Sequence, residues 1–84
     1  MVAPNPVSGS NASVHYILEN DGVADFKVMN IDGHILQTIQ LGNKNTGAFT
    51  YNLGGLDKFP AANYIIVLEQ DGQTITRYRF TIIK

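Results

Sequence analysis

The 84-residue sequence contains no cysteine and few charged side chains. Without cysteine, the chain has no disulfide scaffold, no thiol nucleophile and no structural zinc site of the usual type. Charged residues make up 15% of the chain, against roughly 25% in an average soluble domain. Six basic and seven acidic residues exclude the basic footprint of a nucleic-acid-binding protein, a polybasic membrane patch and an acidic tail.

Long apolar runs are also absent. No run approaches the ~20 residues that a helix needs to span a membrane. The first six residues, MVAPNP, lack the basic and apolar regions of a signal peptide. A chain of this length has room for one core, so we expect residues 1–84 to form a single domain, with residues 1–11 as an extended lead-in.

Two classes of residue dominate the composition. Val, Ile, Thr, Phe and Tyr account for 29 of the 84 residues, and these side chains favour the pleated surface of a β-sheet. Gly, Pro, Asn, Asp and Ser account for another 27, and they favour turns. Turn-forming clusters recur at short intervals, at 20–22, 32–33, 42–45, 54–55 and 71–72. This spacing predicts an all-β domain of short antiparallel strands.

Several runs between the turns alternate apolar and polar residues, as strands with one buried face do. The run 64–68 is instead apolar at every position, which predicts a central strand covered on both faces. The run 35–41 breaks the alternation at Leu36, which predicts a bulge or an edge strand. The Asp-Gly pairs at 32–33 and 71–72 each predict a type I′ hairpin, because both central residues of that turn need positive φ.

About six or seven strands without a long helix predict an antiparallel β-sandwich of the immunoglobulin or fibronectin type. Its core should consist of the inward residues of the strands. These are Val14, Tyr16, Leu18, Phe26, Val28, Ile39, Phe49, Tyr51, Leu53, Tyr64, Ile66, Leu68, Phe80 and Ile82.

Candidate catalytic residues are few and scattered. His15 falls on the polar face of a predicted strand and His34 follows a predicted turn, so both are expected to be surface residues. Glu19 and Glu69, the only glutamates, stand at strand ends and do not predict the paired carboxylates of a glycosidase. The serines, at positions 8, 10 and 13, lack the glycine-flanked elbow of an esterase nucleophile. We expect no enzyme activity.

Metal, phosphate and sugar sites are also not indicated. The segment 20–22 lacks the remaining ligands of a calcium loop, and the glycines at 54–55 precede neither a Lys-Ser/Thr pair nor a helix. Tyr16, Tyr51 and Tyr64 could form a platform for stacking on a sugar, but they alternate with core positions and are expected inside. No cofactor and no metal is predicted.

Four segments, taken in order, resemble a known family. They are Pro4-Asn5-Pro6, the segment 28–33 (VMNIDG), the segment 55–68 ending in the apolar strand, and the closing segment 77–84 (RYRFTIIK). They are similar to the PNP opening, the aliphatic-Tyr-Asp-x-x-Gly segment, the Leu-x-x-Gly-x-Tyr strand and the Lys-terminated last strand of one group of domains. These are the C-terminal sorting domains (type A) of cargo proteins of the type IX (Por) secretion system of Bacteroidetes.

The chain departs from the family pattern at three positions. Asn30, Asn63 and Arg79 stand where the family favours Asp, Gly and Lys. Asn30 keeps a side chain that can stabilise a turn. Asn63 is the mildest replacement for Gly if the backbone there needs positive φ. Arg79 preserves the charge with a different geometry.

The resemblance implies a non-catalytic role as a secretion signal. Such a domain follows an N-terminal cargo domain, folds in the periplasm and is recognised by an outer-membrane translocon. A sortase-like protease usually removes it, and the cargo is released or anchored at the cell surface. No nucleic-acid partner is implied, and an exposed edge strand would also allow self-association.

Two sets of residues follow from this interpretation. The last strand is the expected recognition element, read in part by strand addition; its residues are Arg77, Arg79, Phe80, Ile82, Ile83 and Lys84. The competing interpretation is that its cations only guard an edge strand against aggregation. The second set consists of family motif residues with a structural role: Pro4, Asn5, Pro6, Gly33, Asn63 and Tyr64.

Two other classes of protein share this pattern. One is an Ig-like accessory module, a spacer or carbohydrate binder, of a secreted hydrolase or adhesin. A line of exposed aromatic residues on one sheet would favour it, whereas a polar surface with a charged last strand favours the sorting role. An Ig domain of the flagellar-hook-cap type resembles the sequence more loosely.

Overall fold

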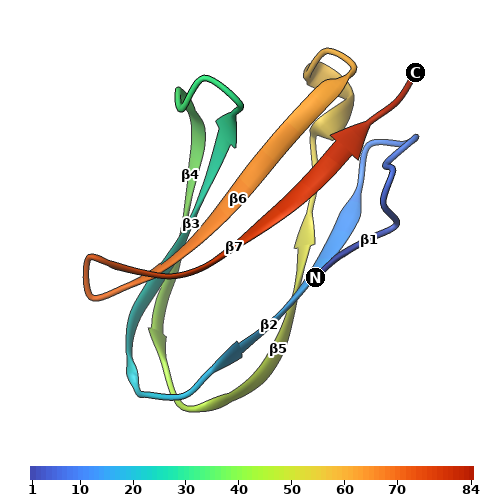
Figure 1. Ribbon diagram of the computed structural model, residues 1–84. Helices are drawn as coiled ribbons and strands as arrows, with labels where there is room; N and C mark the ends of the chain where they lie inside the picture. The colour runs from blue at the N-terminus through green and yellow to red at the C-terminus, as the bar shows by residue number, and fades with distance from the viewer.

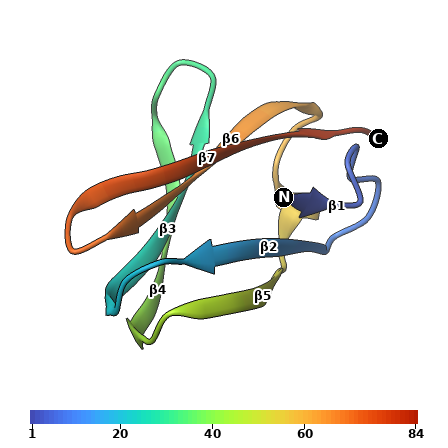
Figure 2. The same ribbon diagram turned by 60° about the horizontal axis from the view of Figure 1, so that its bottom comes forward.

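The computed structural model describes residues 1–84 and shows two antiparallel β-sheets packed face to face (Figures 1 and 2). One sheet has the strand order β1 (Val2–Ala3), β2 (Ala12–Leu18), β5 (Gly47–Leu53). The other has the order β4 (Ile35–Lys44), β3 (Gly22–Asn30), β6 (Ala62–Gln70), β7 (Gln73–Ile82). A short 3₁₀ helix, η1 (Leu56–Lys58), precedes β6. The predicted all-β sandwich is confirmed, with seven strands. No helix is long and apolar enough to cross a membrane.

The core lies between the sheets, where alternate residues of each strand point inward. In β2, for example, Val14, Tyr16 and Leu18 are buried, while His15 and Ile17 are exposed. All the predicted core residues except Phe49 and Tyr51 are buried. Those two are half-buried because β5 is an edge strand of its sheet.

The core also contains residues that the sequence did not predict. Val2 and Val7 of the lead-in and Leu56 of η1 are buried, the last two completely. None of them belongs to a run of alternating apolar and polar residues, so no pattern indicates its burial. Residues 1–11 therefore contribute β1 and part of the core. Figure 2 shows β1 at the side of the sandwich, between β2 and β7.

One of the two predicted type I′ turns is present. Asp71 and Gly72 both have positive φ, 52° and 81°, as the β6–β7 turn requires. At the β3–β4 turn only Gly33 does, with φ 88°, so the type I′ prediction is wrong there. The amide of Gly33 donates to the carbonyl of Asn30, and the side chain of Asn30 accepts the amide hydrogens of Asp32 and His34. These bonds stabilise a three-residue loop that ends in a left-handed glycine.

As predicted, β6 is a central strand and β4 is an edge strand with a bulge. β6 lies between β3 and β7, and its outward residue Val67 is only 5% exposed. No second layer covers that face, so the side chains of neighbouring strands shield it. β4 is an edge strand, and its pairing with β3 skips a residue at Leu36, where the alternation breaks.

Leu56 provides a test of the part of the core that comes from a loop. We expect Leu56→Ala to lower the free energy of unfolding by about 2–5 kcal/mol, because it leaves a cavity under η1. Ile31→Ala is the matched control, since Ile31 is 71% exposed and its truncation should change stability by less than about 0.5 kcal/mol. Urea unfolding of both variants measures the difference. Equal, small losses would show that Leu56 does not support the core.

Stability should fall in alkali because of Tyr16 and Tyr78. Burial raises the pKa of both phenols above the ordinary value of 10.0, so the folded state keeps protons that the unfolded state releases. This contribution is complete below pH 10 and decreases as the pH rises through the pKa of the folded state. We expect Tyr78→Phe to lose less stability than the parent protein between pH 9 and about pH 11, each referenced to its own value at pH 7. Urea unfolding across this range measures it, and identical pH profiles would contradict the assignment.

Candidate recognition surface

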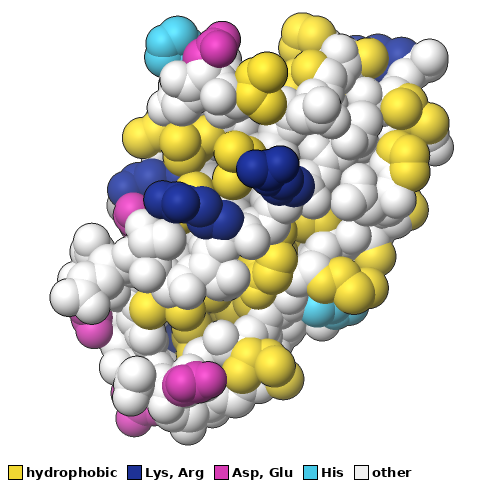
Figure 3. Space-filling view, in the orientation of Figure 1, with side chains coloured by type: hydrophobic (Ala, Val, Ile, Leu, Met, Phe, Trp, Pro, Cys, Tyr) yellow, Lys and Arg dark blue, Asp and Glu magenta, His cyan; other side chains and the backbone are white.

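The solvent-facing side of the four-stranded sheet carries Lys27, Arg77 and Arg79, three of the six basic residues of the chain. We define this outer face by Asp25, Lys27, Met29, Ile65, Val67, Glu69, Arg77 and Arg79. The strand register sets them in rows, with Lys27, Val67 and Arg77 in one row and Met29, Ile65 and Arg79 in the next. Figure 3 shows basic side chains gathered there beside hydrophobic ones.

Only one of the three cations of the outer face has an acidic partner. Lys27 forms an ion pair with Glu69, and both side chains are partly buried. The hydrogen bond to Glu69 raises the pKa of Lys27, with a smaller contribution from the charge of Asp25. Arg77 and Arg79 are exposed, and no carboxylate lies within ion-pair distance of either. Their guanidinium groups are therefore free to bind an external anion.

The two arginines border a hollow that the ion pair of Lys27 and Glu69 also lines. Its aliphatic part, which we call the aliphatic hollow, includes the half-buried Ile65 and Met29 and the exposed Ile35 of the edge strand β4. A guanidinium group binds carboxylates through two parallel hydrogen bonds, and an aliphatic hollow favours apolar side chains. The outer face is therefore suited to a peptide or protein surface that presents acidic and apolar groups together.

The predicted recognition residues divide into two groups. Phe80 and Ile82 are buried, because alternation along β7 points them into the core. In the folded domain they support the strand and are not available for contact. Arg77, Arg79, Ile83 and Lys84 are exposed, although the ammonium group of Lys84 donates to the carbonyl of Asp57 at 3.0 Å.

The lead-in is bonded to the free edge of β7. The side chain of Asn5 donates to the carbonyl of Arg79 at 3.2 Å and accepts the amide hydrogen of Thr81 at 3.0 Å. The backbone of Val7 donates to the carbonyl of Thr81 at 2.7 Å and accepts the amide hydrogen of Ile83 at 2.9 Å. We call Asn5 and Val7 the N-terminal clamp. Because the clamp occupies this edge, strand addition along residues 79–83 would have to displace it.

The other motif residues also have structural contacts. Pro4 and Pro6, both exposed, flank Asn5. Tyr64 is buried, donates its hydroxyl hydrogen to the carbonyl of Pro60 at 2.6 Å, and stacks on Phe80 with ring centroids 5.6 Å apart. Asn63 is an ordinary strand residue of β6 without positive φ, so the reason considered for a Gly there does not apply.

Sequence reasoning missed several residues of this surface. Lys27 and Glu69 lie far apart in the chain, and only the register of β3 with β6 brings them together. The aliphatic hollow was detectable in part, because Ile65 belongs to the fully apolar run. No sequence pattern indicated that Val7 of the clamp is buried, since it is a single apolar residue that follows Pro4-Asn5-Pro6.

The clamp predicts a measurable loss when Asn5 is truncated. Asn5→Ala removes a donor and an acceptor that satisfy backbone groups of β7, so we expect the free energy of unfolding to fall by about 1–3 kcal/mol. The amide hydrogen of Thr81 should exchange faster. Asn43→Ala is the control, because Asn43 is exposed and its side chain makes no hydrogen bond within the protein. Unchanged exchange at Thr81 would contradict the role of the clamp.

The histidines and tyrosines considered as candidate site residues lie on the surface and in or against the core, respectively. No group of three His, Asp or Glu side chains is arranged to hold a metal ion. His15 and His34 are exposed as predicted, and a ring nitrogen of His15 lies 3.0 Å from the hydroxyl of Thr50. Tyr16 and Tyr64 lie in the core, and Tyr51 packs against it. Comparisons with protein-family models, with curated proteins and with solved structures found no match for this chain.

Proposed function

We propose that this domain is a non-catalytic sorting domain of the type IX secretion system, which directs an N-terminally attached cargo protein across the outer membrane for release or anchoring at the cell surface. One observation carries the proposal. Pro4-Asn5-Pro6 and the closing strand, the two ends of the resemblance, lie side by side and are joined by the hydrogen bonds of the N-terminal clamp. Segments about seventy-five residues apart in the sequence thus form one structural unit.

A shared export signal has to look the same on every cargo. A translocon that handles many proteins can rely only on features that the cargo does not alter, and a rigid sheet face meets this condition. The clamp holds β7 in place from one side and β6 holds it from the other. The outward side chains of β7 therefore project from a fixed backbone.

Arg77 and Arg79 are the side chains most suited to recognition. They are exposed and lack an acidic partner, and they flank aliphatic residues that a partner can cover. An ion pair formed with a partner across this face would be partly shielded from water and stronger than one on an open surface. The translocon is expected to contact these side chains rather than to add a strand along residues 79–83.

The surface gives less support to a carbohydrate-binding module. All eight aromatic residues of the chain are buried or half-buried. The large exposed apolar side chains are Met1, Ile17, Val23, Ile31, Ile35, Leu36, Ile75 and Ile83, which offer no ring for stacking on a sugar. A spacer role needs no binding surface, and a lack of export in the following experiment would favour it.

The test uses a reporter protein fused to the N-terminal side of residues 1–84 in a bacterium that has a type IX secretion system. We expect the reporter to reach the cell surface or the medium, and the double variant Arg77→Gln/Arg79→Gln to lose most of this export. The control, Lys44→Gln/Lys58→Gln, removes the same charge away from the outer face and should be exported normally. Deleting residues 80–84 is a poorer test, because it removes Phe80 and Ile82 from the core.

The two parts of the proposal fail in different ways. If the unmodified fusion stays in the periplasm, the sorting role is wrong. If both double variants are exported equally well, the domain is a signal but the arginines are not its recognition element, and they guard the edge strand instead. Thermal unfolding of each variant verifies that export is compared between folded domains.

A further inference from the structure

The pairing of β2 on its β1 side stops halfway along the strand. Met1 and His15 exchange two backbone hydrogen bonds, each 2.7 Å long, as a hydrogen-bonded pair of an antiparallel ladder does. In such a ladder the next backbone groups that point to the same side belong to the residue two positions further on. In β2 this residue is Ile17, and no strand lies beside it on that side.

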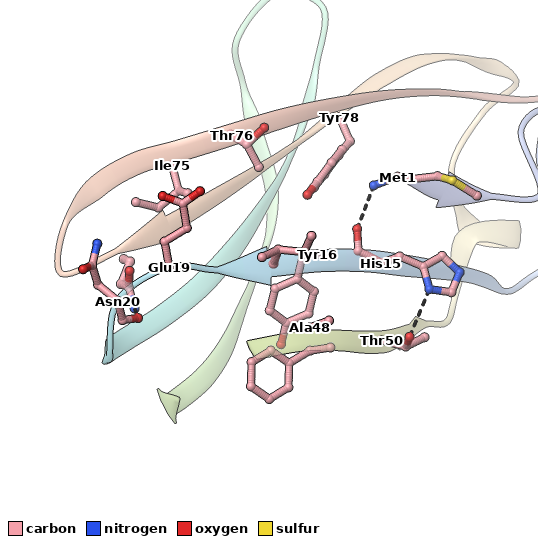
Figure 4. A pocket seen from close by; sticks show the side chains of 13 residues that line it. Met1, His15, Tyr16, Glu19, Asn20, Ala48, Thr50, Ile75, Thr76 and Tyr78 are labelled. Carbon is pink, nitrogen blue, oxygen red and sulfur yellow. Dashed lines mark hydrogen bonds between the residues drawn. The ribbon is translucent and has the colours of Figure 1, made fainter. Parts of the chain in front are cut away.

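A groove begins where the pairing stops. Its volume is about 790 Å³, and it follows β2 from Met1 to Glu19, with Ile75 and Tyr78 of β7 on one side and three residues of β5 (Ala48, Phe49 and Thr50) on the other (Figure 4). Tyr78 extends from β7 toward β2, and Glu19 and Ile75 lie at the far end. Ile17 and Ile75 are exposed apolar side chains along it. The groove thus combines unpaired backbone groups with apolar side chains.

The chain direction at Met1 leads into this groove. β1 runs antiparallel to β2, and the following lead-in runs parallel to β7, with Val7 beside Ile82. Continued backward from Met1, the same strand would pass His15, Ile17 and then Glu19. Since β-strands advance about 3.3 Å per residue, about four residues would cover this stretch.

We propose that this groove is the seat of the four residues that directly precede Met1 when the domain follows a cargo protein, and that they extend β1 along β2. The inference rests on the proposed function, which requires such a preceding segment. The side chains of the first and third residues before Met1 would point between the sheets, as Val2 does, and should be apolar. The side chains of the second and fourth residues before Met1 would face water.

The position of the Met1 nitrogen supports this occupant. It donates to the carbonyl of His15 as the amide of an interior strand residue would, so a preceding peptide bond keeps this hydrogen bond. Burial lowers the pKa of the Met1 ammonium group, and an amide has no such charge to desolvate. A covalently attached segment also enters at high effective concentration, whereas a separate peptide or a second copy would have to fit its own chain beside Met1.

The experiment compares three chains by amide hydrogen exchange. One is residues 1–84 alone. The second carries Thr-Val-Thr-Val directly before Met1, which places valine at both inward positions. The third carries Val-Thr-Val-Thr, which has the same composition with valine at the outward positions. Both extensions begin with the same Gly-Ser linker, so that the new N-terminus is held away from the groove.

We expect the in-register extension to slow exchange of the Ile17 amide by about tenfold or more and to raise the midpoint of thermal unfolding. The out-of-register extension should protect this amide much less, because a one-residue shift turns its valines to water. Equal exchange in all three chains would overturn the proposal, and so would equal protection by both extensions. Protection that depends on protein concentration would identify a second copy as the occupant and overturn it as well.

This measurement involves no translocon. An unprotected groove in a domain that is still exported would refute the extended strand alone. A protected groove in a domain that is not exported would refute the sorting role alone.

Discussion

The sandwich depends on how the exposed edge of β7 is closed. Asn5 and Val7 bind backbone groups of this strand that would otherwise face solvent unpaired. An open edge strand is a template for association with other chains, so this closure affects solubility as well as stability. It also holds the buried Val7 and Phe80 in place, because both lie in the segments that the clamp joins. The aromatic pair of Tyr64 and Phe80 depends in turn on the position of β7.

The same closure separates two kinds of surface on β7. Its inward side chains belong to the core, and its far edge is bonded to the lead-in along residues 79–83, so that only outward side chains remain available there. This arrangement leaves a structural strand with side chains that can serve the recognition role proposed above. The arginines lie on a backbone that the rest of the fold holds fixed, so their substitution need not disturb packing.

The fold was largely predictable because alternation along a strand reports directly which side chains are buried. This was so for Val14, Tyr16 and Leu18 in β2 and for Phe80 and Ile82 in β7. The break at Leu36 also indicated the bulge of an edge strand. Local sequence patterns did not predict burial or pairing where these depend on contacts with a distant segment of the chain. The lead-in has no alternation, yet pairing with β2 and β7 buries Val2 and Val7. The pair of Lys27 and Glu69 depends on the register of β3 with β6, and the turn at Gly33 on the side chain of Asn30.

The contact between Asn5 and Thr81 also constrains the order of folding. A hydrogen bond between residues 76 positions apart forms only after nearly the whole domain has been synthesised. Contacts of such sequence separation slow folding, because the intervening chain must be ordered first. A chain that stops before residue 81 lacks Thr81, one of the two partners of Asn5, and cannot complete this closure. The closed edge of β7 therefore exists only in a molecule that has been translated through its last strand.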